Sequence, residues 1–416
     1  MKTIFADIIT IGDEILYGQI TDTNSQWISA ELDYIGIKVT RKTSVGDNEA
    51  DILQLLREAE SRSEIIVITG GLGPTSDDLT KPCLAKYFNS SLKLNEEVLN
   101  DLKEFFIKRG RELTETNKQQ AYVPDICQVI RNHYGTAPGM WFERHGKIFI
   151  SMPGVPFEMK AMMTEVILPR LKDFFKTPFI YHRVIQTIGI GESYLADKIK
   201  DWERNLPSVI KLAYLPSLGE VKLRLTASGE ASAIKTIVEA EAVKLKELIF
   251  DYVYTEKDEP IEKVIGNLLK TKNLTIAFAE SCTGGFVSSL ITSVPGSSEY
   301  FAGSVVAYQN DIKEKLLAVK AATLKTYGAV SEQTVKEMAE GIRLSFNADI
   351  GVSTSGIAGP GGGTLEKPVG TIWIAYADKH KTVARKLSLG KLRDINIKQT
   401  AAATLNLVRQ SLLEKD

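Results

Sequence analysis

The hydrophobic pattern in the first part of the chain switches between short apolar runs and stretches with apolar residues every three or four positions. The runs predict strands and the stretches predict helices. In chain order these are a strand at 4–11, a helix at 23–34, a strand at 37–45, a helix at 48–62 and a strand at 64–69, then a strand at 147–151 and a helix at 157–175. The initial β-α-β-α-β order predicts a parallel sheet in an α/β domain, which we place at residues 1–170.

Two further segments follow, each with its own pattern. The middle one has strand-like runs at 181–186 and 221–226 and helical spacing at 194–203 and 231–250. This predicts a small α+β domain over residues 171–255, which a polar linker ending at Pro260 separates from the rest. The last segment predicts a second α/β domain over residues 258–416. Its expected strands are 274–279, 303–309, 349–353, 371–377 and 382–387, and its expected helices are 261–270, 311–319, 331–346 and 393–413.

Composition narrows the class of protein. A chain of 416 residues fits two or three domains of roughly 150 residues each. Its 51 Lys and Arg balance 52 Asp and Glu to a net charge of -1, so there is no global positive field to hold nucleic acid or a membrane surface. The three cysteines form no C-x-x-C pair, and no apolar run approaches the ~20 residues of a membrane span. We therefore expect a cytoplasmic protein with reduced thiols and no membrane contact.

The most distinctive stretch of the first domain is a glycine-rich turn, Gly70 to Thr75, followed by Asp77 and Asp78. It comes directly after a predicted buried strand, where glycines let backbone N–H groups approach an anion such as phosphate. Carboxylates repel phosphate, but they can hold a divalent cation that bridges to it. Loops at 12–18 and 152–159 follow other strands of the same sheet and bring acidic residues to the same edge. The pattern predicts a metal–phosphate site; the alternative is a tight turn in which an aspartate caps the next helix.

These loops resemble the amino-terminal domain of the competence/damage-inducible protein A (CinA) family, which is similar in fold to molybdopterin-binding domains. The resemblance is carried by the loop at 12–16, by Thr23 with Asn24, by the stretch 70–80 and by the stretch 153–159. It implies a metal-dependent ADP-ribose pyrophosphatase that releases AMP and ribose 5-phosphate. The implied ligands of the divalent metal are Asp78, Glu158 and Glu14, and the implied substrate contacts are Asn24, Gly71, Gly73 and Thr75.

Residues in the last domain predict acyl-transfer chemistry. A serine nucleophile needs a base, but His380 is the domain's one histidine, so a Ser-His-Asp triad is not expected. A lysine can replace histidine if it is neutral, and Lys313 falls in the first turn of a predicted helix, where the helix dipole disfavours an ammonium. Ser298, Tyr308 and Lys313 therefore form a candidate catalytic set. Ser281, at a strand-to-helix turn, is the competing nucleophile, and a solvated Lys313 on a surface helix is the alternative.

The same domain resembles the nicotinamide-nucleotide amidase domain that ends the CinA family. The resemblance lies in the stretch 279–285, in the stretch 296–303 with Tyr308 and Lys313, and in the glycine-rich stretch 356–360. It implies hydrolysis of nicotinamide mononucleotide to nicotinic acid mononucleotide and ammonia, without a metal or other cofactor. The implied catalytic residues are Ser298, Tyr308 and Lys313. The implied substrate contacts are Glu280, Ser281, Thr283, Gly284, Ser355, Gly356 and Arg393.

The middle segment resembles the family's K-homology-like domain. Nucleic-acid-binding versions of that domain clamp the backbone with a Gly-x-x-Gly loop, whereas Gly189 to Glu192 departs from that pattern and its carboxylate repels phosphate. We interpret the segment as a spacer or dimer element and expect a homodimer whose partners are small nucleotides. Two alternatives stay open: a first domain that binds a pterin nucleotide or transfers an adenylyl group, and a non-enzymatic factor associated with competence or DNA damage.

Overall fold

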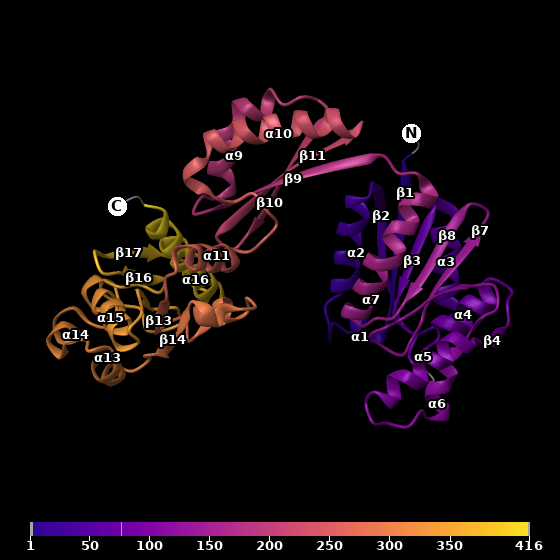
Figure 1. The fold of residues 1–416 in the computed structure, drawn as a ribbon, viewed down its shortest axis with the longest axis horizontal. Helices are drawn as coiled ribbons and strands as arrows, with labels where there is room; N and C mark the ends of the chain where they lie inside the picture. Colours follow the sequence, from indigo (N-terminus) through magenta and orange to yellow (C-terminus); the bar gives the residue numbers. More distant parts are fainter. Residues whose placement is uncertain (1–2, 76, 415–416) are drawn as a thin grey trace. The chain divides into compact units, whose positions relative to one another are not determined.

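The computed structural model describes residues 3–75 and 77–414 (Figure 1). The chain divides into two units, one of Met1–Ile180 with Ser228–Ala233 and the other of Tyr181–Ala227 with Ile234–Asp416. Both units mix helices with sheets, and the architecture is α/β, as the sequence pattern predicts. No helix in the described part of the chain is both long enough and apolar enough to cross a bilayer.

A six-stranded sheet forms the centre of the first unit, in the order β2-β1-β3-β8-β7-β6. The first four of these strands are parallel, and the last two run antiparallel to their neighbours. Their bounds are β1 Ile4–Ile11, β2 Ile37–Val45, β3 Ile65–Thr69, β8 Lys147–Met152, β7 Gly139–Arg144 and β6 Gln128–Ile130. The predicted parallel strands are present, and an antiparallel edge that the sequence pattern did not predict extends them.

Helices cover both faces of this sheet (Figure 1). Alternate residues of β1 point to opposite sides, so that Ile8 packs with one helical layer and Ile9 with the other. The first layer contains α2 Thr23–Tyr34, α7 Pro156–Met162 and α8 Leu168–Phe175, and the second contains α3 Glu49–Arg62 and α4 Thr80–Tyr87. The helix predicted at 157–175 is broken into α7 and α8 by a π-turn at Met163–Ile167. Residues 92–124 add the short strands β4 Leu92–Leu94 and β5 Tyr122–Pro124 and the helices α5 Glu96–Ile107, α6 Glu115–Lys118 and η1 Gln119–Ala121.

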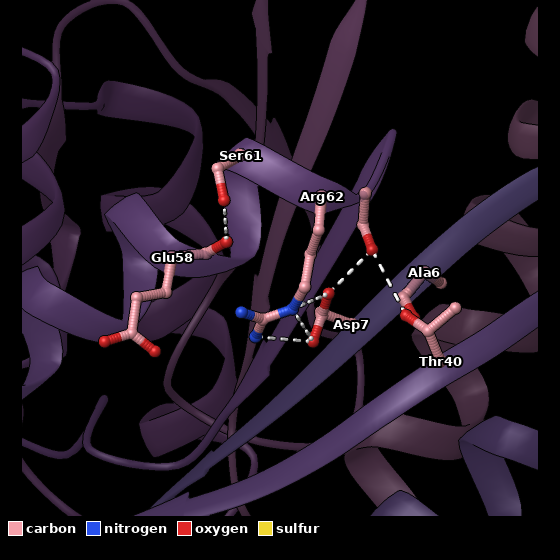
Figure 2. Close-up of polar contacts among 7 residues, drawn as sticks. Ala6, Asp7, Thr40, Glu58, Ser61 and Arg62 are labelled. Carbon is pink, nitrogen blue, oxygen red and sulfur yellow. Dashed lines mark hydrogen bonds and ion pairs between the residues drawn. The ribbon is translucent and has the colours of Figure 1, made fainter.

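A buried ion pair ties the end of α3 to the central strand β1 (Figure 2). Asp7 is 1% exposed, and its carboxylate accepts hydrogen bonds from Arg62 Nε and Nη2 at 2.9–3.1 Å. Ser63 Oγ donates a further hydrogen bond to the same carboxylate at 2.6 Å. A carboxylate buried within a sheet needs such partners because its desolvation is costly. The pair therefore fixes where α3 ends relative to the sheet.

The second unit begins with the middle module, a four-stranded sheet in the order β10-β11-β9-β12. The strands are β9 Phe179–Ile188, β10 Ile210–Ser217, β11 Glu220–Gly229 and β12 Val253–Thr255, and the helices are α9 Glu192–Arg204 and α10 Ala231–Leu248. Apolar residues of both helices pack on one face of the sheet. The module is α+β, as predicted. The sequence pattern did not predict β10, whose sequence IKLAYLPS is half exposed and contains proline.

A five-stranded sheet in the order β14-β13-β15-β16-β17 forms the core of the C-terminal domain. Parallel pairing joins β13 to β14 and to β15, and antiparallel pairing joins β15, β16 and β17. The strands are β13 Ile276–Glu280, β14 Phe301–Val306, β15 Ile350–Gly356, β16 Thr371–Ala377 and β17 Thr382–Ser388. One face packs against α11 Ile261–Lys272, α12 Phe286–Thr292 and α16 Arg393–Leu413, and the other against α13 Asn310–Leu317, α14 Ala321–Tyr327 and α15 Glu332–Ser345.

The middle module and the C-terminal domain share part of one hydrophobic core. Ile188 of β9 and Tyr254 of β12 pack in the same buried cluster as α11 and α16. Gln186 Nε2 donates to the carbonyl oxygens of Lys257 and Glu259 at 3.0 and 2.9 Å. The segment 255–260, which we expected to be a linker between separate domains, is therefore held by hydrogen bonds to β9.

Candidate functional sites

A cavity of about 210 Å³ lies at the edge of the C-terminal sheet, where β13 and β15 end. This is the edge at which loops following parallel strands meet, so residues distant in sequence converge there. The lining residues are Ser281, Cys282, Tyr308, Lys313, Ala329, Val330, Ser355, Gly356, Ala358 and Arg393. The cavity is thus lined by residues that carry one amine, two serine hydroxyls, one thiol, one phenol and one guanidinium, and no histidine lines it among the described residues.

Lys313 is the most unusual residue of this cavity because it is 1% exposed. It belongs to the first half of α13, and its amine lies 2.7 Å from Ala307 O, 3.2 Å from Tyr308 O and 3.3 Å from Ser281 Oγ. Burial lowers the pKa of Lys313 because desolvation disfavours the ammonium, and the negative form of the neighbouring Cys282 thiol would oppose this lowering. The alternative of a solvated Lys313 on a surface helix is therefore wrong.

Ser281 begins the turn that joins β13 to α12. Its N–H donates to Thr354 O at 2.9 Å, which ties the turn to β15, and its own carbonyl accepts from the N–H of Gly284 at 3.2 Å. Gly284 and Gly285 have φ of 61° and 97°, in the left-handed region that favours glycine. This sharp reversal leaves the Ser281 side chain at the sheet edge, beside the Lys313 amine.

Tyr308 and Arg393 form the exposed side of the same cavity. Arg393 Nη2 donates to Tyr308 Oη at 2.9 Å, and Arg393 Nη1 donates to Gly359 O at 2.9 Å. Tyr308 is 58% exposed. Ser355 Oγ donates to Ala329 O at 2.8 Å, so that this hydroxyl is held within the wall. Among the described residues that line the cavity, Arg393 carries the one guanidinium, and the residue is exposed.

Four of the residues predicted for this site lie elsewhere. Ser298 is exposed in the 3-10 turn Ser297–Glu299 and does not line the cavity, so the set of Ser298, Tyr308 and Lys313 is not assembled in the structure. Glu280 is fully buried, and its carboxylate accepts from the N–H groups of Gly285, Val287 and Ser288 and from the Ser288 hydroxyl. It therefore anchors the start of α12 and has no free oxygen edge for a substrate hydroxyl. The other two residues are Thr283, whose hydroxyl lies 2.7 Å from that of Thr354, and Gly284, which is exposed on the turn.

The larger cavity of the first unit has a volume of about 640 Å³ and lies at the carboxyl edge of its parallel strands. Most of the residues predicted for the metal–phosphate site line it, namely Glu14, Asn24, Gly71, Gly73, Asp78 and Glu158. Gly70 has φ of 104°, and a β carbon added there would lie 2.1 Å from Ile11 O, so only glycine lets the turn pass the end of β1. The three predicted loops thus converge on one cavity.

Asp78 organises the glycine-rich turn. Its Oδ1 accepts from Gly73 N at 2.7 Å, and its Oδ2 accepts from Thr75 N at 3.0 Å and from the Thr75 hydroxyl. Thr75 is exposed and is held by Asp78, and it does not line the cavity. The N-cap of α4 is Leu79, so the alternative of an aspartate cap at that helix is also wrong. One lone pair of Oδ1 is left for a further partner.

Glu158 and Glu14 occupy different environments. Glu158 is 9% exposed, and its Oε2 accepts from Asn132 Nδ2 at 2.7 Å, whereas Oε1 accepts no hydrogen bond from the described residues. Burial raises the pKa of Glu158, and the hydrogen bond from Asn132 opposes this rise. Glu14 is exposed, and its carboxylate lies over Gly12, where an added β carbon would be 2.6 Å away.

These acidic residues fit a metal ion only in part. Among residues 3–75 and 77–414, no group of three or more His, Cys, Asp or Glu side chains is arranged to hold a metal by itself. Asp78 Oδ1 and Glu158 Oε1 each have capacity for one more partner and line the same cavity. Magnesium is commonly held in this way, by one or two carboxylates together with oxygens of a bound phosphate substrate. The residues therefore fit a cation that binds together with its ligand.

Three family models match the chain in succession. They are a probable molybdopterin binding domain at residues 7–173, the damage-inducible protein CinA KH domain at 182–255 and the CinA C-terminal domain at 258–412. A CinA-like protein of Cytophaga hutchinsonii is 57% identical over 412 residues, which cover 99% of both chains. The chain belongs to the CinA family. Another CinA-like protein, from Flavobacterium psychrophilum, is 44% identical and covers 98% of this chain and 99% of its own.

Among solved structures, the protein CinA from Thermoplasma acidophilum is 36% identical, with a TM-score of 0.38. It covers 42% of this chain and 99% of its own. A competence/damage inducible protein from Agrobacterium tumefaciens is 32% identical, with a TM-score of 0.35, and covers 38% of this chain and 100% of its own.

Sequence reasoning missed several residues of this CinA-family protein that shape the two cavities. Gln120 lines the first cavity from η1, and Asn132 holds Glu158 there. Lys81 lies behind that wall, and Cys282 lines the second cavity beside Ser281. Gln120, Asn132 and Lys81 carry no motif signal, because their roles depend on contacts between segments far apart in sequence. Cys282 is the exception that its position next to Ser281 could have indicated.

Proposed function

We propose that this CinA-family protein is a cytoplasmic hydrolase with two activities, a nicotinamide-nucleotide amidase in the C-terminal domain and a metal-dependent ADP-ribose pyrophosphatase in the first domain. The observation that carries the amidase proposal is the buried Lys313 amine, 3.3 Å from Ser281 Oγ in a cavity of about 210 Å³. The substrate classes come from the resemblance to the family, and the geometry supports the chemistry.

The contacts of Lys313 can be made by a neutral amine as well as by an ammonium, and the proposed base is the neutral form, which burial favours. A neutral amine has two N–H donors and one lone pair, and Lys313 has three partners. Two are carbonyl oxygens, Ala307 O and Tyr308 O, which can only accept hydrogen bonds. In the neutral state both N–H bonds go to these carbonyls, and the lone pair faces the Ser281 hydroxyl. This is the arrangement that a general base requires.

In the proposed reaction, the Lys313 amine takes the proton of Ser281 as Oγ attacks the carboxamide carbon of the substrate. The carbon–nitrogen bond of the tetrahedral intermediate then breaks, and the proton held by Lys313 passes to the departing nitrogen, which leaves as ammonia. A water molecule, deprotonated by the same amine, then attacks the acyl-serine; as the acyl carbon–Oγ bond breaks, the proton on Lys313 returns to Ser281 Oγ and the carboxylate product is released. In this proposal Arg393, which lines the cavity, would bind the substrate phosphate as a cation.

The nucleophile is tested by Ser281→Ala and Ser298→Ala, assayed for ammonia release from nicotinamide mononucleotide. Removal of Ser281 should abolish release, whereas Ser298→Ala, at an exposed position outside the cavity, should retain most of it. The opposite result would reassign the nucleophile to Ser298. Loss in neither variant, with loss in Cys282→Ala, would move the covalent step to the thiol.

For the first domain, the supporting observation is a glycine-rich turn and two carboxylates with spare lone pairs around one cavity of about 640 Å³. Asp78 and Glu158 would hold a divalent cation, which neutralises the charge of a diphosphate during attack by water. The N–H groups of the glycine-rich turn would position the phosphate oxygens. The role of Asn132 is to hold the Glu158 carboxylate in place.

Glu158→Gln is the cleanest test of this site, because glutamine keeps an acceptor for Asn132 while it removes the charge that attracts a cation. Hydrolysis of ADP-ribose should fall and should need more metal for half-maximal rate. Asp78→Asn is a poorer test, since the same carboxylate also holds Gly73 and Thr75. An unchanged rate and metal dependence in Glu158→Gln would remove Glu158 from the site.

A further inference from the structure

The glycine-rich loop 356–363 supplies part of the wall of the C-terminal cavity, through Gly356 and Ala358. Its sequence is GIAGPGGG, and Gly359 has φ of 96°, in the left-handed region that glycine adopts readily. Few side chains are available to hold such a loop, so its conformation depends on hydrogen bonds to its backbone. Ile357 is fixed by bonds to Gly370 and Thr371 of the neighbouring strand region. The next two carbonyls are held from another element.

Helix α16 holds these two consecutive carbonyls. Asn396 Nδ2 donates to Ala358 O at 2.9 Å, and Arg393 Nη1 donates to Gly359 O at 2.9 Å. Residues three apart lie on the same face of a helix, so both side chains reach the loop from one side. Asn396 Nδ2 also donates to Gly390 O at 2.9 Å, in the segment that leads into α16. One amide thus joins the loop to the start of the helix.

The orientation of the Asn396 amide is fixed by its partners. The side chain is 0% exposed, and both partners of Nδ2 are carbonyl oxygens, which can only accept. Rotating the amide by 180° would set its oxygen against two acceptors. In the observed orientation, Oδ1 is buried without a hydrogen-bond partner among the described residues. An unpaired buried acceptor lowers stability. The amide therefore contributes two donors to the loop and leaves one oxygen unpaired.

The orientation of Arg393 depends on the same loop. Arg393 is exposed, and its guanidinium is directed by two acceptors, Gly359 O and Tyr308 Oη, each at 2.9 Å. A long side chain that is free to move loses conformational entropy when it binds a ligand, and ordering it beforehand avoids that loss. Gly359 directly follows Ala358. The bond from Asn396 to Ala358 O therefore restrains the peptide that leads to one of these two acceptors.

We propose that Asn396 is a positioning residue for phosphate recognition in the C-terminal cavity. By holding Ala358 O, it fixes the adjacent Gly359 carbonyl, and this carbonyl orders the Arg393 guanidinium before the ligand arrives. The inference rests on the proposed function, in which Arg393 binds the phosphate of a nicotinamide nucleotide. Asn396 does not line the cavity itself, so it acts through Arg393 and leaves the chemistry at Lys313 unchanged.

The first test compares KM with kcat for ammonia release. Asn396→Leu should raise KM for nicotinamide mononucleotide about threefold to tenfold, the effect of leaving one long side chain unordered, and should change kcat by less than about twofold. For nicotinamide riboside, which lacks the phosphate, kcat/KM should stay at the wild-type value. Thr404→Val is the matched control, because Thr404 is buried in the same helix and its hydroxyl donates to Thr400 O at 2.7 Å within that helix. The control should keep both parameters.

A double-mutant cycle tests whether Asn396 acts through Arg393. Once Arg393→Met has removed the guanidinium, Asn396→Leu should raise KM no further. Effects that multiply in the double variant would overturn the proposal, because they would show that the two residues act independently. A wild-type KM in Asn396→Leu, or a fall in kcat as large as the rise in KM, would also overturn it. If Asn396→Leu does not fold, Asn396→Ala, which adds no atoms, takes its place in every comparison.

Calorimetry keeps this inference distinct from the proposed activity. The ligands are nicotinic acid mononucleotide and nicotinic acid riboside, which differ by the phosphate and carry no amide to hydrolyse. The wild type should bind the mononucleotide more tightly, and Asn396→Leu should reduce this preference about threefold to tenfold. If the wild type releases no ammonia but shows this pattern, the amidase proposal fails and the positioning proposal stands. Equal or absent binding of the two ligands by the wild type, or a preference that Asn396→Leu keeps, overturns the positioning proposal, whether or not hydrolysis occurs.

Discussion

Replacement of Lys313 by methionine isolates the amine of the C-terminal cavity from the rest of its side chain. The stem of Lys313 is buried, and methionine is a flexible apolar chain of similar length that can occupy the same space. What disappears is the group that faces Ser281 Oγ at 3.3 Å. If that group is the general base, kcat for ammonia release should fall by about 10²- to 10⁴-fold, the usual range for such a base.

The expected change in stability is much smaller. The variant loses the hydrogen bonds to Ala307 O and Tyr308 O, each worth about 1 kcal/mol. It also no longer buries a polar amine, which costs about 1–3 kcal/mol in proteins. These contributions oppose each other, so the free energy of unfolding should change by no more than about 1–2 kcal/mol. Lys313→Ala also removes the apolar stem and should cost a further ~2–3 kcal/mol.

The assay pairs ammonia release from nicotinamide mononucleotide with denaturant unfolding of both variants. Equal loss of activity in Lys313→Met and Lys313→Ala, with destabilisation mainly in the second, would support an amine that acts in chemistry. Substantial ammonia release by a folded Lys313→Met variant would refute the reasoning, because no other base contacts Ser281 Oγ among the described residues of the cavity.

Four further outcomes are expected. Because burial lowers the pKa of Lys313, the amidase rate measured across pH should rise as the amine loses its proton, below the ordinary lysine pKa of about 10.4. The free energy of unfolding should also rise with pH between the lowered pKa and that ordinary value, because the unfolded chain binds the proton more tightly there. A chelator should stop ADP-ribose hydrolysis and leave ammonia release unchanged, with added Mg²⁺ restoring the former. Glu280→Gln should lower the free energy of unfolding by about 3 kcal/mol, since the buried carboxylate loses bonds from the start of α12; a melting temperature equal to wild type would contradict its anchoring role. Arg62→Met should cost about 3 kcal/mol, because the buried Asp7 carboxylate would keep the Ser63 hydroxyl but lose its positive partner. Breaking the exposed Lys86–Glu49 pair should cost less than ~1 kcal/mol in the same denaturation experiment.

The sequence predicted the elements whose pattern is local. Apolar runs such as Ile65–Thr69 are buried on both faces in the structure, and the helices that follow them have the expected spacing. The antiparallel strands β6 and β7 and the inserted segment 92–124 were missed. Their short, mixed sequences acquire strand character from pairing with neighbours, which a local pattern does not encode.

The candidate sites divide in the same way. The sheet-edge rule predicted that Gly71, Asp78 and Glu158 would line one cavity, and the argument from the helix dipole predicted a perturbed lysine at 313. The sequence did not predict that Ser281 lines the cavity and Ser298 does not, because both serines are associated with turns and look alike in sequence. Glu280, next to Ser281, was predicted as a substrate contact. Its carboxylate instead accepts hydrogen bonds from backbone N–H groups at the start of α12.

The core shared by the middle module and the C-terminal domain has a consequence for separating the two proposed activities on different polypeptides. Cutting the chain at residue 258 would strip Ile188 and Tyr254 from the cluster that also holds α11 and α16, and it would remove the carbonyl of Val253 that accepts from Arg409 at 3.0 Å. A fragment beginning at Tyr181 keeps both intact. The middle-module strands β9 and β12 are therefore part of the folding unit of the C-terminal domain. A fragment designed to carry the amidase activity alone should begin before these strands.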